Sequence, residues 1–183
     1  MRYTALLLIL ALAGCGGAVS PESATPTIQA APSFEPPDAA PAEVIEGLDG
    51  QAFMGALDLQ GFACGEPQQF TTALQQWNCT LAGPDAQGPS YEVIILGESP
   101  AAVHSIDASV DQLLATQADP VLITGFLSLI AITADFSGAD PVAASEWVAE
   151  NAKTESVQLE RPGVTYNLRG PAELRGLEIV ATE

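Results

Sequence analysis

One histidine and three cysteines are the side chains of this sequence with the most reactive chemistry. Nucleophilic catalysis needs an activated serine or cysteine next to a base, and His104 is the only imidazole that could be that base. The periodicity after Pro100 predicts a helix, on which His104 lies near Asp107 and Asp111 at spacings of three and seven. This spacing favours a solvated histidine–aspartate pair, although a partner serine could come from any part of the chain.

Other patterns of catalysis and of ligand binding are missing from the sequence. The segment Gly97-Glu98-Ser99-Pro100 fails as a nucleophile elbow after its serine, and there is no Walker loop, dinucleotide fingerprint or EF-hand spacing. Two carboxylates are enough for a glycosidase, but among 23 acidic residues some pair falls close together by chance. The sequence therefore predicts no catalytic residue, no cofactor and no metal site.

The N-terminus carries the most specific motif. Leu12-Ala13-Gly14-Cys15 closes a short apolar segment that follows Arg2, and this segment is far below the roughly 20 residues needed to cross a bilayer. The arrangement resembles the lipobox of bacterial lipoproteins. The resemblance implies that residues 1–14 are a signal peptide that is removed, and that Cys15 carries the lipid (palmitate-type acyl chains). It also implies an extracytoplasmic protein on the outer face of the cell membrane, or at an outer membrane if the cell has one.

Residues 15–43 read as the lipidated cysteine followed by a tether. Six prolines lie between residues 16 and 43, and there are few large apolar side chains to build a core. We expect a disordered, proline- and alanine-rich segment that holds the domain up to roughly 90 Å from the bilayer, at about 3.1 Å per residue.

If Cys15 is acylated, Cys64 and Cys79 remain in an exported domain, where two thiols most simply pair. The loop between them predicts a stabilisation of roughly 3 kcal/mol in the chain-entropy model. A zinc set would need more ligands than two cysteines and one histidine, and a catalytic thiol would need His104 as its base.

The charge is strongly acidic, with 5 Lys and Arg against 23 Asp and Glu and a formal net charge of −18. Between Gly16 and Ala152 there is no lysine or arginine. Such a surface repels nucleic acids and anionic lipids, so we exclude a nucleic-acid partner. It is compatible with simple solubility, with a halophilic surface, or with a cationic partner or divalent ions.

Residues 44–183 form one predicted α+β domain. The pattern predicts about three to four helices on one face of a mostly antiparallel sheet of about five strands. Helices are expected from residue 44 or 49 to residue 60, after Pro100, at 121–136 and at 141–152. The helix at 121–136 is apolar nearly all round and is expected to be the buried central helix. Strands are expected at residues 71–81, 91–96, 156–160, 164–168 and 175–182. The repeated Ala-Asp-Pro-Val at residues 118–121 and 139–142 predicts two helix starts.

These observations favour a non-enzymatic, lipid-anchored binding or scaffold protein of the cell envelope, whose partner is another protein or a cationic surface. Two alternatives stay open. One is a carrier or sensor of a small apolar ligand held between the helix at 121–136 and the sheet, and the other is a small envelope hydrolase that uses His104. The sequence leaves the oligomeric state open.

Overall fold

The structure is a computed structural model that describes residues 43–82, 90–110, 119–171 and 174–182. The expected signal peptide, Cys15 and most of the tether lie outside the described residues. The described elements, in chain order, are α1 (Gly50–Leu59), β1 (Ala63–Cys64), β2 (Gln68–Gln69), β3 (Gln75–Leu81), β4 (Tyr91–Ser99), β5 (Ala102–Val110), α2 (Pro120–Thr133), α3 (Pro141–Glu150), β6 (Ser156–Arg161), β7 (Val164–Arg169) and β8 (Gly176–Ala181).

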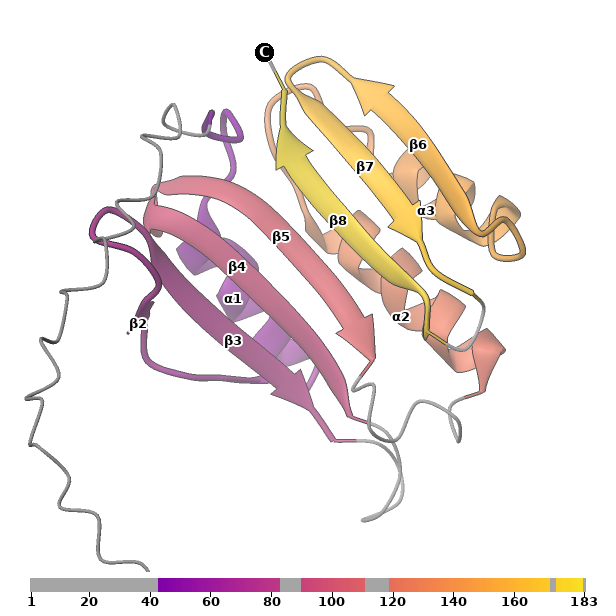
Figure 1. Cartoon of the computed structure of the whole chain (residues 1–183), viewed down its shortest axis with the longest axis horizontal. Coiled ribbons are helices and arrows are strands. Elements are labelled where there is room, and N and C mark those ends of the chain that lie inside the picture. The colour runs from indigo at the N-terminus through magenta and orange to yellow at the C-terminus, as the bar shows by residue number, and fades with distance from the viewer. Residues whose placement is uncertain (1–42, 83–89, 111–118, 172–173, 183) are drawn as a thin grey trace, which may run out of the picture. The chain divides into compact units, whose positions relative to one another are not determined.

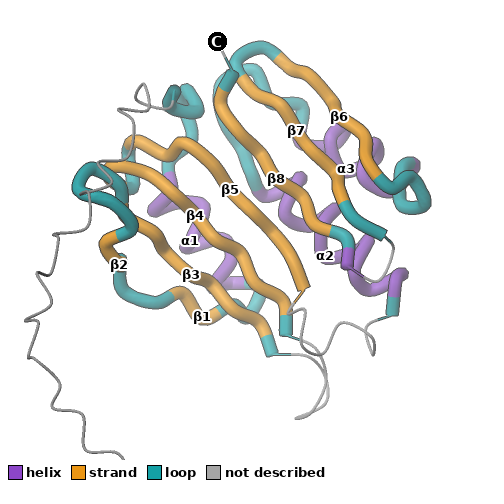
Figure 2. The backbone as a smooth tube through the Cα atoms, in the orientation of Figure 1, coloured by secondary structure: helices purple, strands orange, loops and turns teal. Residues whose placement is uncertain are grey.

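All eight described strands belong to one antiparallel sheet. The strand order is β1-β3-β4-β5-β8-β7-β6, and β2 pairs with β3. The helices lie on one face of this sheet and leave the other face uncovered by secondary structure (Figures 1 and 2). The predicted α+β class is confirmed in outline, but the sheet has eight strands where about five were expected.

The sheet consists of two halves with similar topology. In the first half, α1 precedes the strands β3, β4 and β5, and in the second half α2 and α3 precede β6, β7 and β8. The halves meet where β5 pairs antiparallel with β8, with Ile106 opposite Ile179 and Ala108 opposite Leu177. Both Asp-Pro helix starts belong to the second half, so the sequence shows no repeat between the halves and their similarity is visible only in the topology.

The helix predicted after Pro100 is wrong, because residues 102–110 form strand β5. Ile106, Ala108 and Val110 are buried while the residues between them are partly exposed, which is the alternation of a strand. β5 forms a hairpin with β4, and their pairing runs from Tyr91–Val110 to Ser99–Ala102. The helical spacing of the apolar residues was coincidental, since the hydrogen bonds to β4 decide the conformation.

The two Asp-Pro helix starts are confirmed. Asp119 caps α2 by accepting a hydrogen bond from the Val121 N–H at 2.8 Å, and Asp140 caps α3 by accepting from the Ala143 N–H at 3.0 Å. In both helices a proline occupies the first turn, where its missing N–H costs nothing.

Helix α1 also ends as the sequence predicts. Gly61 adopts a left-handed φ of +93°, and its N–H donates to the Asp58 carbonyl at 2.9 Å. The N–H of Phe62 donates to the Leu57 carbonyl at 3.1 Å, which completes a Schellman closure. The predicted strand at 71–81 starts later than expected, at Gln75, because residues 70–74 form a turn.

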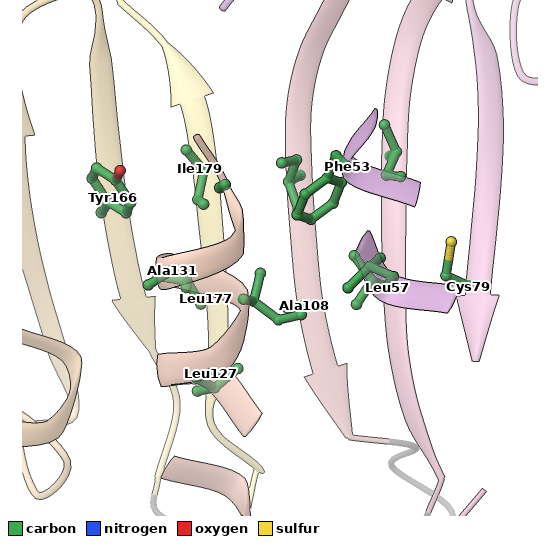
Figure 3. Close-up of a cluster of buried hydrophobic side chains, with 14 of the residues drawn as sticks. Phe53, Leu57, Cys79, Ala108, Leu127, Ala131, Tyr166, Leu177 and Ile179 are labelled. Atoms are coloured by element: carbon green, nitrogen blue, oxygen red, sulfur yellow. The ribbon is translucent and has the colours of Figure 1, made fainter. Parts of the chain in front are cut away.

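The core lies between the helices and the sheet. Phe53 and Leu57 of α1 point toward β4 and β5, and Leu127 of α2 points toward β8 (Figure 3). These side chains belong to one continuous cluster of buried residues that runs across both halves of the sheet. The helical layer therefore fixes the positions of both half-sheets.

Candidate functional site

The predicted disulfide is present. Cys64 and Cys79 are bonded and are register partners on the adjacent strands β1 and β3. Trp77 lies two residues before Cys79, on the same face of β3, and is 4 % exposed. Trp77 and Cys64 line an open hollow of about 380 Å³ beside α1. The bridge thus joins the end of α1 to the sheet, as expected.

His104 is buried in a strand, so the expected solvated position on a helix is wrong. Its side chain is 4 % exposed. Leu96 pairs with Ser105 and Gly97 pairs with Val103, so His104 is the extra residue of a β-bulge. A Cβ at Gly97 would lie 2.3 Å from the Ala102 carbonyl oxygen, which explains why glycine stands opposite this bulge.

The imidazole of His104 ties the start of the domain to the sheet. Its Nδ1 lies 2.8 Å from the Glu43 carbonyl oxygen, and the Ile45 N–H donates to the Val103 carbonyl at 2.8 Å. Its buried Nε2 has no hydrogen-bond partner within the described ranges, although a carboxylate oxygen of Glu98 lies 3.8 Å away. No serine hydroxyl is found among the described contacts of this ring. Its contact with the Glu43 carbonyl helps to hold the start of the domain against β5.

The expected partner of His104, Asp107, instead pairs with Arg169 on the uncovered face of the sheet. The Arg169 guanidinium also lies 3.2 Å from Glu178, whose carboxylate accepts a hydrogen bond from Asn167 at 3.1 Å. Asn167, Arg169 and Glu178 line an open hollow of about 410 Å³ whose lining is mainly polar. Because two carboxylates already neutralise Arg169, its guanidinium is not free to bind an anionic ligand.

Helix α2 presents an apolar surface to solvent. Val121 is 76 % exposed, Leu122 is 51 % exposed and Ile132 is 46 % exposed. Gly125 is exposed, with no atom within 4 Å of the place where a Cβ would stand, and Leu129 is partly exposed. At 100° per residue these five positions fall on one side of the helix, which we call the α2 outer face.

The prediction of a buried central helix is therefore correct for only one side of α2. Ile123, Leu127 and Ile130 on the inner side are 0 % exposed. The sequence signal for the outer face was present, because residues 120–134 contain no charged residue. That signal predicts complete burial, since a helix that is apolar all round is normally covered on every side.

Exposed carboxylates lie at both ends of α2 and on the neighbouring helix α3. Asp119 precedes the helix, Asp135 follows it, and Glu146 and Glu150 lie on the neighbouring helix α3, and all four are exposed. Helices α2 and α3 are in contact, with the Ser128 hydroxyl 3.4 Å from the Ser145 carbonyl oxygen. Residues 119–152, which include both α2 and α3, contain no lysine or arginine, so the charged side chains of these two helices and of their caps are all carboxylates.

In the part of the chain that the structure describes, no three His, Cys, Asp or Glu side chains gather in a way that would hold a metal ion. The same residues contain no helix with the length and apolar character needed to span a membrane.

Comparison of the chain with models of protein families, with curated proteins and with solved structures found no match in any of the three.

Proposed function

We propose that the chain is a lipid-anchored, extracytoplasmic binding protein of the cell envelope, without catalytic activity of its own. The observation that carries this proposal is the Leu12-Ala13-Gly14-Cys15 motif after a short apolar run, which resembles a lipobox. In the proposal, Cys15 bears the acyl chains and residues 16–43 connect it to the domain.

Two features of the domain support the proposal. The Cys64–Cys79 disulfide fits an oxidising compartment outside the cytoplasm. The exposed apolar face of α2 fits a protein that binds another macromolecule, because soluble domains rarely leave contiguous apolar surface without a partner. No comparable observation among the described residues favours the apolar-ligand carrier or the hydrolase.

Acylation is tested by expressing the full chain in a bacterium together with an alkyne fatty acid. We expect the mature protein to begin at Cys15, to carry the alkyne label and to sediment with membranes. The matched control, Cys15→Ala, should lose the label and the membrane association while its domain keeps the disulfide. An intact, unlabelled N-terminus in the unsubstituted chain would refute the anchor, and with it the proposed function.

A further inference from the structure

We propose that the α2 outer face is a docking site for a basic amphipathic helix of a partner protein. The inference rests on the proposed binding function and names the surface and the chemistry of the partner. Its basis is one juxtaposition: an exposed, uncharged apolar helix face with carboxylates at both ends of the helix and on the helix beside it.

The apolar component comes from α2 itself. The helix has 14 residues, so at 1.5 Å per residue it offers a face about 21 Å long. Val121, Leu122 and Ile132 are each close to half exposed or more, and they lie near both ends of the helix. Gly125 lies between them and leaves room at the centre, which allows a second helix to approach closely.

The internal packing of the domain does not explain this face. The inner side of α2, with Ile123, Leu127 and Ile130, already fills the space above the sheet. Polar residues in place of Leu122 and Ile132 would be compatible with the fold, because both positions already face solvent. Since no described part of the chain requires an apolar side chain there, we attribute the apolar character of the outer side to a contact with another molecule.

The charges near α2 distinguish between the possible binding partners of the outer face. Asp135, Glu146 and Glu150 are exposed near α2, and the domain as a whole is strongly acidic. An anionic bilayer would be repelled by these groups. A second copy of the chain would bring its own carboxylates to the same rim, and such like-charge contacts are unfavourable. A helix with an apolar stripe flanked by lysine or arginine matches both the apolar face and the rim.

The test uses the full acylated chain in nanodiscs of zwitterionic lipid. The probe is a fluorescent 14-residue peptide of leucine and lysine, with leucine at helical spacing and of the same length as α2. We expect fluorescence anisotropy to show saturable binding of this peptide. A leucine–glutamate peptide with the same leucine positions should bind at least about tenfold more weakly, which corresponds to about 1.4 kcal/mol.

Two matched variants localise the binding. Gly125→Gln places a side chain in the open space at the centre of the face, and we expect a loss of affinity of about tenfold or more. Gly55→Gln makes the same change in α1, where the added Cβ also meets no atom within 4 Å, and should leave affinity unchanged. Because glutamine is a better helix former than glycine, both variants should unfold at or above the temperature of the unsubstituted chain.

Each of the following results would overturn the inference. Equal binding of both peptides, or unchanged binding by Gly125→Gln, would exclude a basic helix at this face. Concentration-dependent dimerisation of the chain that Gly125→Gln abolishes would assign the face to a second copy. Binding of the Cys15→Ala chain to anionic vesicles, lost in Gly125→Gln, would assign it to lipid. Acylation is measured on the same samples: an acylated chain without peptide binding refutes only this inference, whereas an unacylated chain refutes the proposed function alone.

Discussion

Replacement of Tyr166 should remove much of the sensitivity of this protein to alkaline pH. Tyr166 is 0 % exposed, and its hydroxyl has no hydrogen-bond partner within the described residues. Burial raises the pKa of its phenol to about 12; the nearby Arg161 lowers that pKa and Asp140 raises it. The folded state thus holds Tyr166 in its neutral form over a range in which the unfolded chain ionises.

The sign and size follow from this difference. Since the folded pKa lies above the unfolded value of 10.0, the contribution of Tyr166 to stability is fully present below pH 10 and is lost as the pH rises toward 12. With 1.36 kcal/mol per pKa unit, the loss is about 1.4 kcal/mol at pH 11 and approaches about 2.7 kcal/mol at higher pH. At pH 7, Tyr166→Phe should be neutral or slightly stabilising, because the hydroxyl has no partner to lose.

The assay combines urea unfolding between pH 7 and pH 11 with tyrosinate absorbance at 295 nm. If residues 1–14 are removed, Tyr91 and Tyr166 are the only tyrosines, and Lys153 is the only lysine. Burial also raises the pKa of Tyr91, and the charge of Asp119 adds to this, so Tyr91→Phe serves as the matched background. In that background, the remaining phenol should titrate well above its ordinary value.

Two results would refute the reasoning. One is a folded Tyr166 that titrates near pH 10 in the Tyr91→Phe chain, because the phenol would then not be desolvated. The other is a Tyr166→Phe chain whose unfolding free energy falls between pH 9 and pH 11 as steeply as that of the unsubstituted chain, because the alkaline loss would then come from other groups.

Two further predictions concern the scaffold. Replacing Cys64 and Cys79 together by serine should lower the unfolding free energy by roughly 3 kcal/mol in urea titrations. A reducing agent should no longer change the stability of this variant. An unchanged urea midpoint would show that the bridge does not constrain the unfolded chain. Gly97→Ala should lower the unfolding free energy by about 1–3 kcal/mol, since the new methyl would lie 2.3 Å from the Ala102 carbonyl oxygen. Gly55→Ala, on an open helix face, should raise it by about 0.5–1 kcal/mol. Equal urea midpoints for the two variants would contradict the bulge geometry.

Local signals were sufficient to predict three of the helix ends, which are the starts of α2 and α3 and the end of α1. An aspartate followed by proline satisfies the first N–H groups of a helix by itself, so the starts of α2 and α3 could be predicted at Asp119 and Asp140 without knowledge of the tertiary structure. The left-handed Gly61 likewise marks the end of α1. These contacts span only a few residues, and the sequence displays both partners side by side.

Strand β5 could not be assigned in the same way. Val103, Ile106 and Val110 fit the spacing of a helix as well as part of a strand pattern. The conformation is decided by hydrogen bonds to β4 on one side and to β8, about seventy residues later, on the other. The bulge that buries His104 depends on the close approach of Gly97, which no periodicity reveals. The assignment of His104 to an exposed position failed for this reason.

Helix α2 shows why the candidate site was only half visible. The sequence gives one uninterrupted apolar run and does not separate the residues that stabilise the fold from those that remain outside it. In the structure, Ile123 and Leu127 are 0 % exposed on the inner side, whereas Leu122 and Ile132 face solvent on the outer side. Burial explains the first pair, because each such side chain contributes about 1.5–3 kcal/mol when removed from water. The second pair contributes little to the fold, and its apolar character is the observation from which we propose a binding surface.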